Sequence, residues 1–465
     1  MFDLVTDQAI VSGYLSDASN STGWAEALIR PSSSAAVSEV VRRCQADGRP
    51  LTVTAMRTST TGGPVPNGGW LLSTEQLKWV GEVDGATVRV GAGVILGELQ
   101  EELEKQGWHF PPDPTSRHEC SVGAAIACNA SGARSFKYGP TRGWVESLEV
   151  VLPGGEILEV TRETPIPSEW PEVSWRPPEV KSAAGYEPRG NLLDLMIGQE
   201  GTLGVITAAT LKLQPAPEHH FSCFALFDDV EQALSLVESA RAGAEGVSPR
   251  SIEWFDANSL GLVRESMGDS DRLPARVVAA VWCEQECDST NEESLLEAWF
   301  ALLDGHGADL ERSIFAQSDS EHRALARLRH AVPAGINERV VANGMPKVGT
   351  DCSVPDAHLR EMMALYDRSP LPSFTFGHIG DNHLHLNMLP ATAKELEVAK
   401  DFYREICRRA VALGGSVSAE HGIGKIKRSH LAEMIGPEAL AEFTALKGHL
   451  DPNWILGRGN LLDVP

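Results

Sequence analysis

The sequence has no Cys-x-x-Cys pair, no apolar run long enough to cross a membrane, and no surplus of basic residues. Its eight cysteines are scattered, which favours reduced cytosolic thiols and argues against an iron–sulfur cluster held by this chain. The formal net charge of −24 leaves no basic stripe for phosphates, so a nucleic-acid partner is excluded. The first residues lack the basic and apolar regions of a secretory signal, so we expect a cytoplasmic protein.

The 465 residues, 42% of them hydrophobic, suffice for a large core and more than one domain. Near the start, Val37, Val40, Val41 and Cys44 fall on one helical face, and Gly48 ends that helix. After residue 217, apolar patterns predict strands at 221–227 and 277–283 and helices at 230–241, 293–303 and 394–413. The second half is therefore expected to be an α+β domain with an antiparallel sheet.

The stretch richest in reactive side chains is residues 376–387, Phe-Gly-His-Ile-Gly-Asp-Asn-His-Leu-His-Leu-Asn. Its second half alternates, so His383, His385 and Asn387 share one face of a predicted strand. Two neutral imidazoles and one carboxylate form an open divalent-metal site, and Glu420 is the natural carboxylate. The residues alone leave the alternative open that these histidines are ordinary core or surface side chains.

Small residues dominate several other segments, namely 111–116, 121–132 and 197–207. Such segments let backbone amides approach a pyrophosphate or a flat ring closely. A strand, glycines and a helix also follow one another around residues 87–106, but the spacing is G-x-G-x-x-x-G and no second parallel strand follows. We therefore expect no nicotinamide site there.

Four strings, PPDP…GAAIACNASG, IGQEGTLGVIT, GHIGDNHLH and SAEHGIGKIK, occur in the order of a known family. Over nearly its whole length the chain resembles the flavin-linked D-2-hydroxyacid dehydrogenases, which include D-lactate dehydrogenase, D-2-hydroxyglutarate dehydrogenase and the glycolate oxidase flavin subunit. The resemblance implies an α+β fold with a two-subdomain FAD-binding domain of the vanillyl-alcohol-oxidase type and an antiparallel-sheet cap. It implies FAD-binding residues 1–215, a substrate and metal domain 216–415, and a segment 416–465 that returns to the FAD domain.

The resemblance also implies site residues. Those for FAD are Arg57, Thr58, Thr60, Thr61, Gly62, Gly63, Pro112, Asp113, Thr115, Ser116, Gly123, Asn129, Gly132, Tyr138, Gly201, Val205, Ile206 and Asn460. His378, His385 and Glu420 match the ligands of a divalent metal, usually zinc and sometimes manganese or iron. His421 matches the general base. Arg329 matches a group that pairs with a substrate carboxylate, and Asn387 matches a polar residue on the substrate side.

Two departures from the family pattern stand out. The pyrophosphate loop of the family reads R-G-x-G-T, whereas this chain has Thr-Ala-Met-Arg-Thr at 54–58. We expect those side chains to alter the hold of the loop on phosphates. The family string GHxGDGNxH becomes GHIGDNHLH, which puts His383 where asparagine is common. The sequence leaves open whether His383 supports the ligands or is itself a ligand.

The predicted function is FAD- and metal-dependent oxidation of a D-2-hydroxyacid resembling D-lactate. The resulting electrons would pass to a quinone, a cytochrome or an electron-transfer flavoprotein rather than to a nicotinamide. D-2-Hydroxyglutarate is the alternative substrate, and a metal-dependent hydrolase or a non-catalytic flavoprotein subunit are the alternative classes. A homodimer and a peripheral membrane association through the acceptor are compatible with the resemblance.

Overall fold

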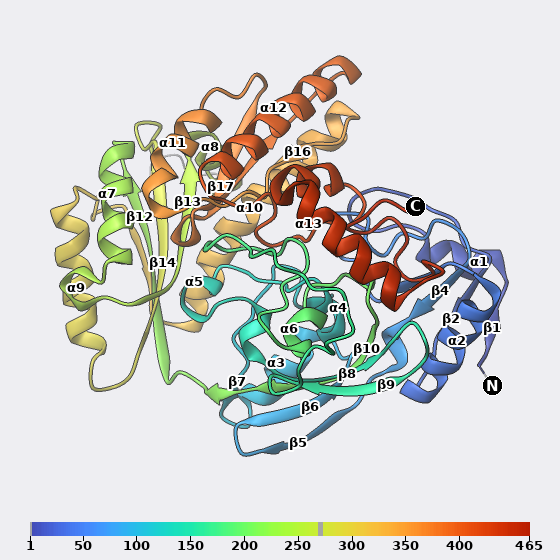
Figure 1. Ribbon diagram of the computed structural model, residues 1–465. Helices are drawn as coiled ribbons and strands as arrows, with labels where there is room; N and C mark the ends of the chain where they lie inside the picture. The colour runs from blue at the N-terminus through green and yellow to red at the C-terminus, as the bar shows by residue number, and fades with distance from the viewer. Residues whose placement is uncertain (1, 268–272) are drawn as a thin grey trace. The chain divides into compact units, whose positions relative to one another are not determined.

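The computed structural model describes residues 2–267 and 273–465 (Figure 1). These residues form two compact units. Unit 1 consists of Met1–Gly132, Gly139–Ala216 and Ser416–Pro465, and unit 2 consists of Ala133–Tyr138 and Pro217–Gly415. The short segment Ala133–Tyr138 thus groups with unit 2 although both of its neighbours in the chain belong to unit 1.

Unit 1 contains a mostly parallel sheet of four strands, an antiparallel sheet of five strands and a two-stranded antiparallel sheet formed by β7 and β11. In the first, β4 (Trp70–Ser73) lies between β2 (Ala27–Ile29) and β3 (Leu51–Thr54), and β1 (Leu4–Val5) pairs antiparallel with β2. The second sheet has the order β5-β6-β10-β8-β9, with every pair antiparallel. The remaining bounds are α1 (Gln8–Val11), α2 (Ser34–Asp47), β5 (Val80–Asp84), β6 (Thr87–Gly91), α3 (Leu96–Glu104), β7 (Trp108–His109), α4 (Val122–Ala127), β8 (Val145–Val151), β9 (Ile157–Thr161), α6 (Leu192–Met196), β10 (Val205–Lys212), β11 (Gln214–Pro215) and α13 (Arg428–Leu450).

In helix α2, the capping residues and the apolar stripe of the sequence agree with the observed ends and buried face. The side chain of Ser33 accepts a hydrogen bond from the backbone N–H of Ala36 at the N-terminus, and Gly48 ends the helix in the left-handed region at φ 62°. The four residues of the predicted apolar stripe are all buried. The predicted end and buried face of this helix are therefore confirmed.

Unit 2 is built on an antiparallel sheet of order β15-β12-β14-β13-β17-β18-β16. The predicted strands and helices of this region are confirmed, with ends that differ by a few residues. Residues 350–355 contact the neighbouring strand through a backbone hydrogen bond from Thr350 N–H to the backbone oxygen of Leu386 at 3.0 Å and a bridge between Ser353 and His383. The bounds are α5 (Ser135–Tyr138), β12 (His219–Phe227), α7 (Val230–Arg241), β13 (Pro249–Asp256), α8 (Ala257–Met267), β14 (Ala279–Cys287), α9 (Glu292–Gly305), β15 (Ile314–Ala316), α10 (Asp319–Asn343), β16 (Val348–Gly349), α11 (Leu359–Tyr366), β17 (Ser373–His378), β18 (His383–Met388) and α12 (Ala393–Ala412).

One face of this sheet carries the main apolar cluster of unit 2. Phe224, Phe255 and Trp282 project from three neighbouring strands and pack with Leu260 of α8 and Val332 of α10. Because side chains alternate along a strand, Glu253 on β13 lies on the same face as Phe255.

Among the described residues, no helix is both long and apolar enough to cross a membrane.

Candidate functional site

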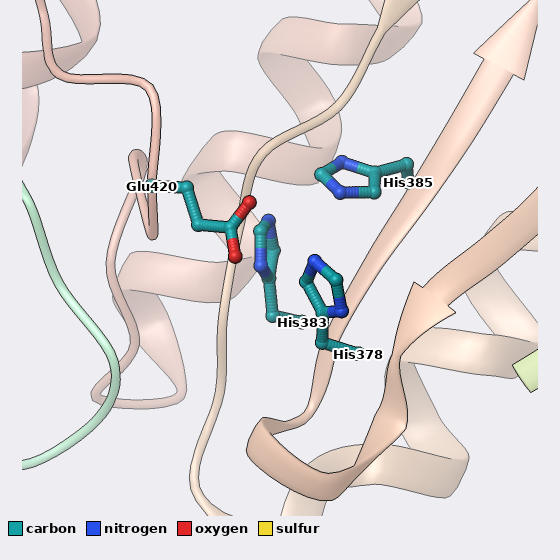
Figure 2. A group of neighbouring side chains, drawn as sticks. All are labelled: His378, His383, His385 and Glu420. Carbon is teal, nitrogen blue, oxygen red and sulfur yellow. The ribbon is translucent and has the colours of Figure 1, made fainter. Parts of the chain in front are cut away.

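Three histidines gather on the two adjacent strands β17 and β18 of unit 2 (Figure 2). The register of these strands sets His378 opposite His383 and Phe376 opposite His385. The ring centroids are 5.6 Å apart for His378 and His383, 5.8 Å for His378 and His385, and 4.4 Å for His383 and His385. One ligand atom from each ring lies within 4.8 Å of the others. The sequence prediction that His383 and His385 share a face of one strand is confirmed.

The turn between the two strands contains one of the residues that depart from the family pattern. Asn382 stands where the family pattern has glycine, and it adopts a left-handed conformation at φ 51°. Asparagine is one of the few side-chain-bearing residues that tolerate this region. Its amide group donates to Asp356 Oδ1 at 2.5 Å, and its Oδ1 accepts from Arg241. The change from glycine therefore preserves the turn.

Each imidazole has an oxygen acceptor beside one of its nitrogens. His378 Nδ1 lies 2.9 Å from Glu253 Oε1, and His383 Nε2 lies 2.9 Å from Asp351 Oδ1. His385 Nδ1 lies 3.1 Å from the backbone oxygen of Thr350. A neutral imidazole that donates one N–H to such an acceptor presents the lone pair of its other nitrogen. This arrangement suits metal ligation.

Glu253 also contacts Arg329, the residue that the sequence assigns to a substrate carboxylate. The Arg329 guanidinium donates from Nε at 2.5 Å and from Nη2 at 2.7 Å to the two oxygens of Glu253. Burial by itself would raise the pKa of Glu253, but the Arg329 guanidinium and His378 outweigh it and hold the pKa well below its usual range. Glu253 is thus a carboxylate that connects Arg329 to His378.

Asn387, the predicted polar residue on the substrate side, lies on the same strand face as His385. Its Oδ1 accepts from Lys347 Nζ at 2.7 Å, and its Nδ2 donates to the backbone oxygen of His385 at 3.1 Å. Removal of the Lys347 ammonium from water lowers the pKa of this lysine. Arg329, Asn387, His378 and His385 therefore belong to the same unit, and three of them lie on adjacent strands.

The other two predicted active-site residues, Glu420 and His421, belong to unit 1. Glu420 Oε1 accepts from Lys181 Nζ at 2.5 Å, and the same ammonium donates to the backbone oxygen of Gly132 at 3.0 Å. The backbone oxygen of His421 accepts from Thr61 Oγ1 at 3.4 Å. Within unit 1, the segment that carries both residues therefore contacts two of the segments predicted to bind FAD.

Glu200 anchors the chain just after His421. Its two carboxylate oxygens accept from the backbone N–H groups of Ile423 and Gly424, each at 2.7 Å. Burial raises the pKa of Glu200 to about 7, although those two hydrogen bonds and the nearby lysines favour the ionised form. Asn460 Nδ2 donates to the backbone oxygens of Glu200 and Gly63, both at 3.0 Å. The predicted FAD residues Gly63, Gly201 and Asn460 are thereby brought together in unit 1.

The loop that differs from the family pattern keeps a glycine-like backbone. Arg57 lies in the left-handed region at φ 61°, where glycine is normally favoured. Its guanidinium stacks on Tyr14 with 4.5 Å to the ring centroid and donates to the backbone oxygen of Ala55 at 3.0 Å. The backbone N–H of Gly62 donates to Asp17 Oδ2 at 3.0 Å. Arg57 therefore places a side chain on a left-handed turn, and the altered hold of this loop on phosphates stays a prediction.

The small-residue segments pack backbone against backbone, as their composition suggests. A Cβ on Gly132 would lie 2.2 Å from the backbone oxygen of Asp113, and a Cβ on Gly123 would lie 2.5 Å from the Cβ of Ala92. Asn129 has φ 47°, and its Oδ1 accepts from the backbone N–H of Arg142 at 3.0 Å. These positions leave no room for larger side chains, which is what a closely packed cofactor cradle requires.

Among the remaining predicted FAD residues, Thr58 and Ser116 are half-buried and Thr60 is exposed. Val205 and Ile206 are buried at the start of β10. Pro112 is buried beside Gln100, whereas Thr115 is exposed. Tyr138 belongs to unit 2, where its hydroxyl donates to Glu286.

Several polar residues at these sites were not assigned from the sequence, namely Glu200, Glu253, Asp351, Lys181 and Lys425. Lys425 Nζ donates to Asn460 Oδ1 at 2.8 Å and to the backbone oxygen of Gly63 at 3.1 Å. Glu253 could have been noticed in the sequence, because it is a charged residue between apolar residues of a strand. Its partners come from distant parts of the chain, so the sequence shows the charge but not its role.

Comparison with known proteins decides the family. Residues 216–461 match the model described as FAD linked oxidases, C-terminal domain, and residues 25–161 match the model described as FAD binding domain. The chain belongs to the FAD-linked oxidase family. It is accordingly an FAD-linked oxidoreductase, and its α+β architecture is the expected fold of the vanillyl-alcohol-oxidase type.

This FAD-linked oxidase is similar to several curated proteins over most of its length. It is 29% identical to a D-lactate dehydrogenase of Anaerostipes hadrus, over 94% of this chain and 89% of that protein. It is 31% identical to a D-2-hydroxyglutarate dehydrogenase of Xanthomonas citri pv. viticola, with the same two coverages. A solved alkyldihydroxyacetonephosphate synthase shares the fold, with a TM-score of 0.70 and 18% identity over 94% of this chain and 76% of that chain.

Proposed function

We propose that this FAD-linked oxidase oxidises a D-2-hydroxyacid to the 2-oxoacid. The observation that carries the proposal is the cluster of imidazoles on β17 and β18, whose ligand atoms lie within 4.8 Å of one another and which each have an oxygen 2.9 to 3.1 Å from one ring nitrogen. The names of the relatives, D-lactate dehydrogenase and D-2-hydroxyglutarate dehydrogenase, support the substrate class.

The proposed metal ligands are His378, His385 and Glu420. The fit rests on the donor set, because oxygens of Glu253 and Thr350 lie 2.9 and 3.1 Å from the Nδ1 atoms of His378 and His385, and a proton on each Nδ1 would leave Nε2 as the ligand atom. Zinc suits two imidazoles and a carboxylate, and manganese or iron are alternatives. A divalent ion there would supply Lewis acidity, which lowers the pKa of a coordinated hydroxyl group.

The proposed FAD-binding residues are those named from the sequence. The close approach of Gly132 to the backbone of Asp113, together with the hydrogen bond from the Asn460 side chain to the backbone oxygen of Gly63, supports a closely packed cofactor site. FAD supplies the acceptor for the hydride that leaves C2 of the substrate. The electron acceptor that reoxidises the protein is proposed to be a quinone, a cytochrome or an electron-transfer flavoprotein.

The residues of the chain have separate proposed roles in this reaction. His421 takes the hydroxyl proton at a ring nitrogen, since a neutral imidazole is a base matched to neutral pH. Arg329 holds the substrate carboxylate, and Glu253 fixes the plane of its guanidinium through two hydrogen bonds. Asn387 contributes a polar contact on the substrate side.

The preferred substrate is a short monocarboxylate such as D-lactate, and D-2-hydroxyglutarate is the second candidate. A buried second carboxylate needs a cation, because an unpaired buried charge is costly. Lys347 is the residue that favours the second candidate, since its ammonium donates to Asn387 and is partly removed from water.

The test is anaerobic bleaching of the flavin by matched concentrations of D- and L-lactate and D- and L-2-hydroxyglutarate. We expect D-lactate to reduce the flavin fastest and both L-acids to fail. Faster bleaching by D-2-hydroxyglutarate that is lost in Lys347→Ala, but retained in the exposed control Lys394→Ala, would select the dicarboxylate. A flavin that none of these acids bleaches would refute the proposed substrate class.

A further inference from the structure

His383 differs from its two neighbours because it stands where the family string has asparagine. Its side chain is fully buried on β18, directly opposite His378 in the strand register. An asparagine at this place offers an amide, whereas histidine brings a third imidazole to the pair already proposed as metal ligands. The question is whether this ring only fills the core or extends the ligand set.

Asp351 lies beside the ring of His383. His383 Nε2 lies 2.9 Å from Asp351 Oδ1, and the side chains of the two residues are 0% and 1% exposed. Asp351 follows Thr350, whose backbone oxygen lies beside His385 Nδ1, so two successive residues orient two of the rings. A neutral His383 ring that donates Nε2–H to this carboxylate would present Nδ1 to a metal.

The three rings therefore share one pattern. In each of them one nitrogen lies 2.9 to 3.1 Å from an oxygen, and the oxygens come from Glu253, Asp351 and Thr350. Ligand atoms of the three histidines come within 4.8 Å of one another. A ring that merely filled the core would need a partner for its polar atoms, but it would not need to converge with two other imidazoles.

We propose that His383 is a third imidazole ligand of the metal site in this chain and that Asp351 is its positioning residue. The inference rests on the proposed metal site and adds a ligand to it. All three imidazoles belong to unit 2, so this unit alone supplies three nitrogen donors. Three imidazoles favour zinc, cobalt or iron over magnesium or calcium, which prefer oxygen ligands.

The decisive measurement counts the imidazoles bound to cobalt. Metal-free protein that retains its flavin is loaded with Co²⁺, and proton NMR is recorded in H₂O and in D₂O. Each imidazole bound to paramagnetic cobalt contributes one strongly shifted N–H signal that disappears in D₂O. We expect three such signals in the wild-type protein and two in His383→Asn.

Affinity gives a second readout that does not depend on turnover. We expect the Kd for Zn²⁺ to rise about 10- to 100-fold in His383→Asn and about 10-fold in Asp351→Asn. The matched control is His358→Asn, which makes the same chemical change at a half-exposed histidine of unit 2 and should leave the Kd unchanged.

The outcomes separate this inference from the proposed function. Two exchangeable signals in the wild-type protein would overturn the role of His383 while leaving a metal site of His378, His385 and Glu420. Absence of Co²⁺ and Zn²⁺ binding would refute the metal site itself and the inference with it. The wild-type count needs no variant, so a folding defect in His383→Asn cannot obscure the result.

Discussion

At the scale of single residues, buried carboxylates organise both halves of the proposed site. Glu253 is drawn towards its ionised form by Arg329 and His378, whereas burial drives Glu200 towards its neutral form. The two residues have similar burial but opposite pKa shifts, because Glu253 has a guanidinium within hydrogen-bond distance and Glu200 mainly has backbone N–H donors. As the pH rises, the contribution of Glu253 to the stability of the folded protein should therefore increase, whereas that of Glu200 should decrease.

Glu253→Gln should destabilise the protein by about 3 kcal/mol near neutral pH, because it leaves the Arg329 guanidinium without its carboxylate. The folded pKa of Glu253 is depressed, so its contribution is present above pH 4.5 and is lost as the pH falls through the folded value. Urea unfolding from pH 3 to 8 measures this. The control Glu265→Gln removes an exposed partner of Arg339 and should cost about 0–1 kcal/mol. Equal effects of the two substitutions would contradict the assigned role.

Glu200→Gln should show the opposite trend. The folded pKa of about 7 exceeds the ordinary 4.5, so the folded state binds the proton more tightly, and wild-type stability falls as the pH rises between these values. The free energy of unfolding of the variant, relative to that of the wild type, should therefore rise by on the order of 3 kcal/mol between pH 4 and 8. Any effect of the substitution on stability that does not depend on pH leaves this rise unchanged. Parallel pH profiles of the urea midpoint for wild type and variant would refute this expectation.

At the scale of elements, the end of α13 is joined to a loop far away in the chain by one buried lysine. Lys447 Nζ donates to the backbone oxygens of Thr202 and Leu456, at 2.7 and 2.9 Å, and to Asp451 Oδ2 at 2.5 Å. Asp451 in turn accepts from the backbone N–H groups of Ile455 and Leu456. A single ammonium group therefore joins the helix to the loop around Thr202 and to the C-terminal segment.

Lys447→Met should cost about 3–5 kcal/mol, because Asp451 would remain buried without its cation. Adding Asp451→Asn should recover part of the loss, since the amide can still accept from the backbone N–H groups without a buried charge. Thermal and urea unfolding of the single and double variants measure this coupling. Lys105→Met, at an exposed lysine, is the control and should change stability little. If the stability changes of the two single substitutions simply add in the double variant, the expected coupling between Lys447 and Asp451 is refuted.

At the scale of the whole molecule, the residues proposed to bind FAD and the histidines proposed to bind the metal lie mainly in different units. Apart from Tyr138, the residues assigned to FAD belong to unit 1, whereas the three histidines belong to unit 2. The segment with Glu420 and His421 returns to unit 1 late in the chain. Binding of the flavin and binding of the metal should therefore be separable by experiment.

The flavin should be held without a covalent bond. The nearest histidines to the predicted loop are His109 and His118, and neither matches a flavin-linking position in the sequence. His109 is buried with Nδ1 3.4 Å from Glu104, and His118 is exposed with Nδ1 3.9 Å from Glu101. Acid precipitation should therefore release all of the yellow colour to the supernatant, as measured by its absorbance. Colour that stays on the precipitated chain would contradict this.

Local patterns and motif order in the sequence determined much of this protein. The stripe of α2, the strands of unit 2 and the shared face of His383, His385 and Asn387 follow from spacing alone, because helices and strands repeat side-chain directions over a few residues. The family was likewise readable from four motifs, and the matches to known family models confirm it.

Only the tertiary structure decided which distant groups meet. It pairs Glu253 with Arg329 and His378, Asp351 with His383, and Glu200 with the backbone after His421. Those partners are separated by tens to hundreds of residues, and their pairing depends on sheet order and strand register. A strand's sequence specifies which face a side chain takes, whereas its neighbours are chosen by the packing of the whole unit, because burial of apolar surface and pairing of buried charges act between elements.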